Sequence, residues 1–176
     1  NHGKYSGIVY GGSSRKQKKN FQIGNKIMLN WKSKGENRIG YFNIELIKPV
    51  APLFFEDKKK SISVLAASTI LKILLPERQI NQKIYHLFED LINNFNQTNW
   101  IKYYIEWELA LIKELGFEID LVNKINLRPK ENKKIEINGK YFNIPKLLLQ
   151  NNSKSFSDHD IKEALIFNKN LILENF

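Results

Sequence analysis

The stretch from Gly11 to Asn20, GGSSRKQKKN, combines the residue types that contact phosphates. Its glycines let backbone N–H groups approach an anion closely, and its serine hydroxyls add further hydrogen-bond donors. Four cations that can neutralise phosphate charge follow: Arg15, Lys16, Lys18 and Lys19. A solvated surface loop is the alternative, but the pattern favours a polyanion site. No Gly-Lys-Ser/Thr sequence is present, so this is not the phosphate-binding loop of a nucleotide hydrolase.

Further cations extend the basic character beyond this stretch. Residues 1–50 hold ten Lys and Arg against two acids, a balance of +8 within a total net charge of +10. Such a concentrated charge predicts a polyanion partner. The additional candidates for DNA contact are Lys26, Lys32, Lys34 and Arg38. Tyr41 is the better candidate for base stacking, because its predicted face of the sheet is opposite to the one that carries Trp31. Tyr10, which leads into the basic stretch, is a second candidate.

Catalytic and metal chemistry find no support in the residue pattern. The chain has no cysteine, and its three histidines are scattered. Ser157, Asp158 and His159 are consecutive, so they cannot adopt the geometry of a catalytic triad, and Ser157 is better explained as a helix cap. The acids Glu106, Glu108, Glu114 and Glu118 are interpreted as the solvent-facing side of one helix. We therefore expect no catalytic residues, no metal site, no cofactor and no enzymatic activity.

Three β signals surround the basic residues. Lys26–Lys32 and Ile39–Ile47 alternate between apolar and polar residues, which is the period of a half-buried strand. Residues 33–38 join them as a hairpin, and Tyr5–Tyr10 is the third candidate strand. We interpret this region as an antiparallel meander belonging to a partial barrel. The chain opens at Asn1 inside this pattern, which suggests a fragment that begins within a domain.

Helical periodicity dominates the rest of the chain. Trp100–Leu121 is the strongest helix, with apolar residues at i, i+3/i+4 and i+7 and with Gly116 placed to end it. Earlier helices are predicted at Asp57–Leu75 and Ile80–Phe95, and a last one starts at Ser157.

A hairpin interrupts this helical region. Short strands flank Asn138-Gly139, a pair that tolerates positive φ at both turn positions. Pro49 and Pro52 mark the end of the β region. The sequence thus predicts an α+β fold: a β domain at 1–50 and a helical domain at 51–176, with a β-hairpin inserted at about 122–146. No apolar run approaches the roughly 20 residues of a membrane span, and the lack of cysteine suits the cytoplasm.

Three motifs in this chain resemble the RecO family of bacterial recombination mediators. They are E-L-A-L-x-x-E-L-G-F-x-x-D-L at Glu108–Leu121, LLPER at Leu74–Arg78, and GG-x-S-R-K…G-N…W-K within Gly11–Lys32. The resemblance implies an oligonucleotide-binding (OB) barrel in the β region. Many family members carry a four-cysteine zinc site just after the position of Leu121, whereas this chain reads VNKINLRPKENKK there, so zinc is not expected.

The resemblance also implies a function and a set of partners. A protein of this kind binds single- and double-stranded DNA and anneals complementary strands. It works with RecR and the single-stranded-DNA-binding protein to load RecA at gaps, and we expect the acidic tail of that binding protein to dock on the helical domain. The rival hypothesis is a non-enzymatic protein-interaction module with no nucleic-acid role. Salt separates the two, because only a polyanion binder loses DNA affinity steeply as salt rises.

Overall fold

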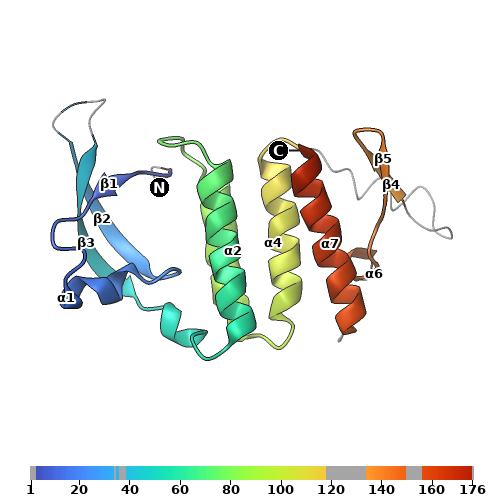
Figure 1. Cartoon of the computed structure of the whole chain (residues 1–176), viewed down its shortest axis with the longest axis horizontal. Helices are drawn as coiled ribbons and strands as arrows, with labels where there is room; N and C mark the ends of the chain where they lie inside the picture. Colours follow the sequence, from blue (N-terminus) through green and yellow to red (C-terminus); the bar gives the residue numbers. More distant parts are fainter. Residues whose placement is uncertain (1–2, 34, 36–38, 118–133, 150–155, 176) are drawn as a thin grey trace. The chain divides into compact units, whose positions relative to one another are not determined.

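The computed structural model describes residues 3–33, 35, 39–117, 134–149 and 156–175. The chain forms two compact units, Asn1–Asn96 and Gln97–Phe176, which are coloured from blue to light green and from yellow-green to red in Figure 1. The fold is mixed α+β, as predicted. These units group the first helices with the sheet, whereas the predicted domain boundary at residue 50 divides the chain differently and stays a prediction.

Unit 1 opens with a three-stranded sheet in the order β1-β3-β2, formed by β1 (Gly7–Ile8), β2 (Lys26–Lys32) and β3 (Gly40–Lys48). β2 and β3 pair antiparallel from Lys26↔Lys48 to Lys32↔Tyr41. The predicted hairpin is therefore confirmed, with β2 at its predicted bounds. Figure 1 shows this hairpin as two long curved strands.

The predicted antiparallel meander is wrong at its first strand. β1 is only two residues long and pairs parallel with β3, through Gly7↔Gly40 and Ile8↔Tyr41. Glycine is required here for close packing: a Cβ on Gly7 would lie 2.5 Å from the Phe42 ring, and one on Gly40 would lie 2.1 Å from Trp31 Nε1. The described strands form an open sheet, so a closed OB barrel is not seen in this part of the chain.

The two faces of the hairpin differ as the alternation predicts. Phe42, Ile44 and Leu46 are partly buried on the inner face, while Asn43 and Glu45 are exposed on the outer one. Trp31 lies on the inner face, where its ring meets Tyr5 edge-on at 5.3 Å and the Arg78 guanidinium at 5.9 Å. Its predicted core role agrees with these contacts.

Two helices complete unit 1: α2 (Lys58–Leu74) and α3 (Gln82–Asn93). Asp57 caps α2 by accepting hydrogen bonds from the backbone N–H groups of Lys59 and Lys60 at 3.0 and 3.1 Å. Both helices match their predicted positions. Short 3-10 turns precede and follow them, η2 (Ala51–Leu53) and η3 (Asn94–Asn96).

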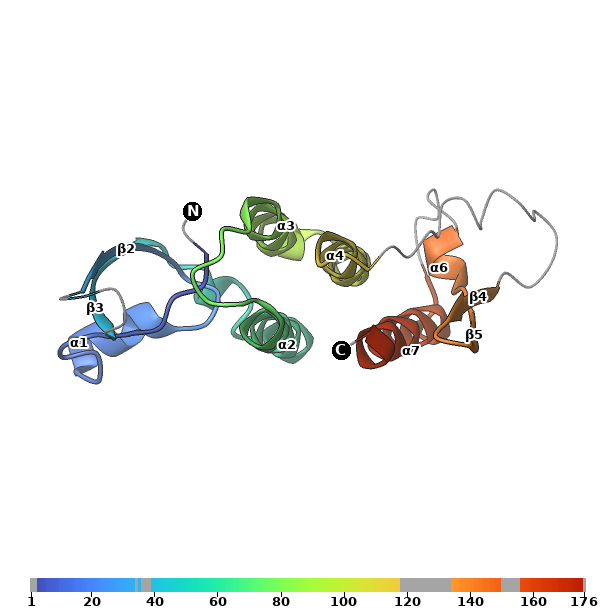
Figure 2. The same cartoon turned by 90° about the horizontal axis from the view of Figure 1, so that it is seen from above.

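Unit 2 is built on α4 (Trp100–Glu114), the helix with the strongest sequence signal. Gly116, at φ 95°, lies just past its C-terminus as predicted, while residues 118–121 of the predicted range lie outside the described residues. α7 (Asp158–Asn175) and the short α6 (Lys146–Leu149) pack with it around Ile105, Ile112 and Leu171, which are fully buried. Figure 2 shows α6 and α7 beside the small hairpin of β4 and β5.

The predicted hairpin is confirmed as β4 (Lys134–Ile137) and β5 (Lys140–Asn143). Asn138 and Gly139 turn between them at φ 49° and 78°, both positive as a type I′ turn requires. Residues 122–133 of the predicted insertion lie outside the described part. Among the described helices, none has the length and apolar character needed to cross a lipid bilayer.

Candidate nucleic-acid interface

The basic stretch of unit 1 is not the irregular loop that its composition predicts. It contains a short helix, α1 (Arg15–Lys18), followed by the 3-10 turn η1 (Lys19–Phe21). Ser14 caps α1, because its hydroxyl accepts a hydrogen bond from the backbone N–H of Gln17 at 3.3 Å. The serine predicted to bind phosphate therefore has a structural partner within the helix that carries the following cations.

All four predicted cations of this stretch are exposed. Arg15, Lys16, Lys18 and Lys19 form no ion pair with a described residue, and neither α1 nor η1 contains an acid. A cation without a nearby carboxylate keeps its full charge for a polyanion. The stretch thus presents a compact basic surface, which we name the α1 cluster and define as these four residues.

One side chain that the sequence analysis assigned no role holds the α1 cluster in place. Asn25 donates from Nδ2 to the backbone carbonyls of Lys19 and Asn20 at 3.3 and 3.4 Å. Its Oδ1 accepts from the backbone N–H groups of Val50 and Ala51 at 2.8 and 3.1 Å. Asn25 thereby ties η1 to the chain that leaves β3. The Gly-Asn pair of the third motif was its only signal in the sequence.

Two tyrosines meet on the outer side of the sheet. The rings of Tyr10 and Tyr41 lie 5.7 Å apart at 59°, and Tyr10 is 76% exposed. Lys32 is the cross-strand neighbour of Tyr41, so its exposed side chain leaves the sheet on the same face. An exposed ring, Tyr10, and a half-buried one, Tyr41, beside a cation are the elements of a base-stacking platform. The structure thus brings the two stacking candidates, Tyr10 and Tyr41, into contact.

The remaining predicted cations do not form one continuous group. Lys26 begins β2, next to the α1 cluster along the chain, whereas Lys32 ends the same strand about 20 Å away at the usual rise per residue. Figure 1 shows α1 at the end of the hairpin where β2 begins and β3 ends. Lys34 and Arg38 lie outside the described residues. The structure thus brings Lys32 together with Tyr41 and leaves the α1 cluster at the far end.

Lys26 differs from the other candidates because it has an acidic partner. Its ammonium group forms an ion pair with Glu89 of α3, and His86 Nδ1 approaches the other oxygen of that carboxylate at 3.8 Å. The hydrogen bond to Glu89 raises the pKa of Lys26, and the same bond lowers the pKa of Glu89. Lys26 is therefore already partly neutralised, which weakens its case as a DNA contact.

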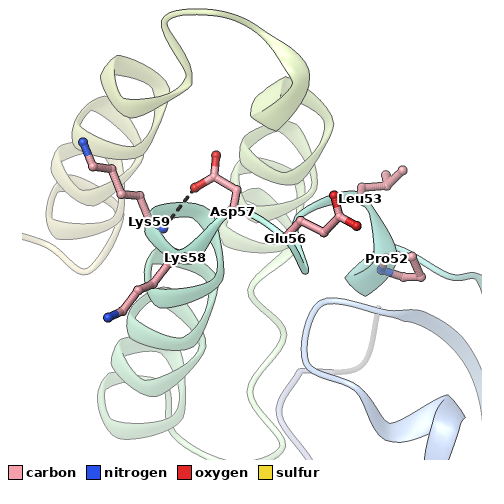
Figure 3. A pocket seen from close by; sticks show the side chains of 6 residues that line it. All are labelled: Pro52, Leu53, Glu56, Asp57, Lys58 and Lys59. Atoms are coloured by element: carbon pink, nitrogen blue, oxygen red, sulfur yellow. Dashed lines mark hydrogen bonds between the residues drawn. The ribbon is translucent and has the colours of Figure 1, made fainter.

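A shallow pocket of about 500 Å³ lies at the start of α2, in unit 1. Figure 3 shows Lys58 and Lys59 extending to one side of it and Pro52 and Leu53 at the other, with two carboxylates between them. Asp57 is one of these carboxylates, and it is already committed to capping α2. This mixture of charges does not favour a polyanion.

In unit 2, one predicted solvent-facing acid is buried instead. Glu108 is only 7% exposed, and it accepts a hydrogen bond from Asn168 Nδ2 at 2.9 Å and another from Tyr104. Burial raises its pKa, although both hydrogen bonds act in the opposite direction. The prediction that Glu108 lies on the solvent-facing side of the helix was therefore wrong. Glu106 and Glu114 are exposed as expected, and Glu118 lies outside the described residues.

One group of potential metal ligands occurs among the described residues, at the start of α7. His159, Asp160 and Glu163 place one ligand atom each within 4.8 Å of one another. Asp160, however, accepts hydrogen bonds from both the hydroxyl and the backbone N–H of Ser157, at 2.6 and 3.1 Å. Ser157 Oγ also accepts from the backbone N–H of Asp160 at 3.2 Å, so the predicted Ser157 cap is part of a capping box that occupies the carboxylate. The absence of a metal site stays a prediction.

Comparisons with known proteins agree with the motifs. The family model described as "Recombination protein O C terminal" matches residues 56–165. The "DNA repair protein RecO" of a Wolbachia strain from Drosophila simulans is 36% identical over 135 residues, covering 75% of this chain and 55% of that protein.

Two further relatives carry the same name. The protein of Ehrlichia chaffeensis is 34% identical, and the protein of Jannaschia is 29% identical. Each match covers 68% of this chain and 49% of the relative. The chain spans about half the length of the curated relatives it matches, and no solved structure matches it. Because the family model covers more than half of the chain and its matches agree with the three motifs, this chain belongs to the RecO family.

Proposed function

We propose that this chain is a DNA-binding recombination mediator that anneals complementary single strands and assists RecA loading during gap repair. The observation that carries the proposal is the α1 cluster, in which four exposed cations follow one another in two elements that contain no acid, and none of the four forms an ion pair with a described residue. Membership of the RecO family, whose relatives are named as DNA repair proteins, supports the choice of DNA as the polyanion.

The proposed contacts divide into two kinds. The α1 cluster neutralises backbone phosphates, while Tyr10 and Tyr41 stack bases beside Lys32. Lys26, Lys34 and Arg38 complete the set predicted from the sequence. We further propose that the open sheet is part of an OB-type barrel. Annealing then requires no hydrolysis, because a cationic surface lowers the repulsion between two like-charged strands.

The proposed partners are single- and double-stranded DNA, RecR, and the acidic tail of the single-stranded-DNA-binding protein, and RecA is an indirect partner. We propose these partners because the chain belongs to the RecO family. The proposed setting is the cytoplasm, and neither cofactor nor metal is required. The rival, a protein-interaction module without a nucleic-acid role, predicts no DNA binding at any salt concentration.

A salt titration with matched variants tests the proposal. The variant Arg15→Glu, Lys16→Glu, Lys18→Glu, Lys19→Glu removes the α1 cluster. Its control changes four exposed lysines of unit 2 to glutamate and so has the same net charge: Lys113, Lys134, Lys162 and Lys169. Fluorescence anisotropy with a labelled oligo-dT strand measures affinity at several salt concentrations.

If wild type neutralises about four phosphates, log affinity falls with log salt at a slope near −3. The α1-cluster variant is expected to lose most binding and annealing, and the control to keep the wild-type slope. Equal losses in both variants would show that only net charge matters. Wild-type annealing that needs ATP would also contradict the proposal.

A further inference from the structure

Two lysines are cross-strand neighbours where the hairpin of unit 1 begins and ends. Lys26 is the first residue of β2, and it pairs with Lys48, the last residue of β3. Side chains directly opposite each other on antiparallel strands leave the sheet on the same face, and like charges in such a pair repel. We name these two residues the lysine pair. An anion beside their ammonium groups relieves the repulsion.

Helix α3 supplies one such anion. Glu89 forms the ion pair with Lys26, and Asn93 Oδ1, one turn further along α3, accepts a hydrogen bond from Lys48 Nζ at 3.5 Å. Residues four apart on a helix lie on one face, so α3 directs one acid and one amide toward the lysine pair. Two positive charges thus meet a single carboxylate, and the group keeps a net positive charge.

An irregularity in β3 aims the lysine pair at α3. Ile27 pairs with Leu46 and Lys26 with Lys48, so Ile47 has no counterpart in β2. An extra residue of this kind bends the strand and redirects the side chains beside it. Strict alternation would place Lys26 on the outer face of β2, whereas α3 and the inner face of β2 line one cavity. The bulge therefore brings the lysine pair to the side of the sheet on which α3 lies.

The ion pair between Lys26 and Glu89 is open to water. The two side chains are 42% and 31% exposed. Ion pairs with this much exposure contribute little to stability, because water screens the attraction and both side chains lose rotamer freedom. A phosphate can therefore replace the Glu89 carboxylate at little cost. It also gains contact with two ammonium groups, because the Cβ atoms of a cross-strand pair lie only about 4.5–5.5 Å apart.

The lysine pair lies at the same end of the hairpin as the α1 cluster. Asn25, just before β2, bonds to the carbonyl of Lys19 and to the backbone N–H of Val50, just past β3. Six cations thus gather at this end. Among the described residues, Glu89 is the one carboxylate that forms an ion pair with any of them. A DNA strand that lies along the α1 cluster therefore meets the lysine pair next.

We propose that the lysine pair is a phosphate-binding subsite of the DNA surface, and that Glu89 is a built-in competitor that sets its affinity. In the free protein Glu89 occupies Lys26. A backbone phosphate displaces this carboxylate and bridges Lys26 and Lys48. Lys48 is then a DNA contact that the sequence analysis did not select. The subsite rests on the proposed function, because DNA is its ligand.

Glu89→Gln tests the competition. Glutamine keeps the shape of the side chain and removes the charge that competes with phosphate. Loss of one exposed ion pair should raise the affinity for labelled oligo-dT roughly two- to fivefold at low salt. Asp90→Asn is the matched control, because Asp90 is an exposed acid of α3 that forms no ion pair with a described residue, and it should have a clearly smaller effect. Anisotropy measures affinity, and thermal melting checks the fold.

The lysine pair supplies a second arm. Lys48→Gln should weaken oligo-dT binding more than Lys169→Gln, which makes the same charge change at an exposed position of unit 2. In a protein that carries both Lys26→Gln and Lys48→Gln, the gain from Glu89→Gln should fall to the Asp90→Asn level, because no paired cation is left to release. In wild type, the carboxyl ¹³C resonance of Glu89 should shift more than that of Asp90 when oligo-dT binds.

Several results would overturn the competition. They are equal gains from Glu89→Gln and Asp90→Asn, a Glu89→Gln gain that survives the loss of both lysines, and a Glu89 resonance that does not move at saturating oligo-dT. Unchanged affinity in a Glu89→Gln protein that melts below wild type would make the ion pair a structural link only. Tighter binding of labelled oligoglutamate, without tighter binding of oligo-dT, would assign the lysine pair to an acidic protein segment.

The outcomes also separate this subsite from the proposed function. Failure of wild type to bind oligo-dT would refute the proposed function, and the subsite with it. Normal wild-type binding that depends on the α1 cluster but not on Glu89 or Lys48 would refute the subsite alone.

Discussion

Replacing Glu108 by glutamine should stabilise unit 2 at neutral pH. The carboxylate is buried between α4 and α7, where it accepts hydrogen bonds from Asn168 and Tyr104 but has no cationic partner among the described residues. Glutamine has nearly the same shape, and its carbonyl oxygen can still accept from Asn168. The substitution therefore removes the charge while keeping the main contact between the two helices.

The expected gain follows from two opposing contributions. Burying an unpaired carboxylate costs several kcal/mol after relaxation, and hydrogen bonds to a charged group return about 1.5–3 kcal/mol each. A net gain on the order of 1–2 kcal/mol is therefore expected for Glu108→Gln. In a chain of this size, that corresponds to an increase in melting temperature of roughly 2–8 °C.

The stabilising effect of Glu108→Gln should depend on pH. Because burial raises the pKa of Glu108, the folded state holds this proton more tightly than the unfolded state does. The wild-type free energy of unfolding should thus fall as pH rises from the ordinary value of 4.5 through the folded-state pKa, and the fall should end above it. The gap between Glu108→Gln and wild type should be small at low pH and should widen across this window.

Urea unfolding from pH 4.5 to 8 measures this gap. A Trp31→Phe background leaves Trp100 and Trp107, both on α4, as fluorescence reporters of unit 2. Glu106→Gln is the matched control, because Glu106 is an exposed glutamate of the same helix and should change stability by less than about 0.5 kcal/mol. A Glu108→Gln variant that is less stable than wild type at pH 7.5, or a gap that does not vary with pH, would refute the reasoning.

Three further predictions follow from single contacts. Gly40→Ala should cost about 1–3 kcal/mol, since the new methyl group meets Trp31 Nε1, and it should cost less in the Trp31→Phe background, which lacks that atom; paired urea curves compare the two backgrounds, and equal costs would contradict the packing argument. Ser157→Ala should lower the melting temperature by a few degrees, because loss of an N-cap costs about 1 kcal/mol; Ser157→Asp, which can still cap, should not. Elemental analysis of the purified protein should find no stoichiometric zinc, and chelator should leave melting unchanged.

The sequence determined the features that depend on neighbouring residues. Four local features occur where the pattern predicted them: the start of α4, the positive φ of Gly116 past its end, the Asn138-Gly139 turn and the Ser157 cap. Each depends on backbone preferences and hydrogen bonds within a few positions, which composition and spacing express directly. The alternation of β2 belongs to the same class, since its period is a property of the strand itself.

Tertiary structure decided which distant groups meet. The parallel pairing of β1 with β3, the Lys26–Glu89 ion pair and the burial of Glu108 all join residues that are far apart in sequence. Periodicity predicted that Glu108 faces solvent. That prediction failed because the period of one helix contains no information on where α7 packs against it. The DNA-contacting residues remain predictions of the sequence. The structure adds the positions of these residues. The α1 cluster is exposed at one end of the hairpin, where the Asn25 hydrogen bonds hold it. Lys32 lies beside Tyr10 and Tyr41 at the other end, where strand pairing places it.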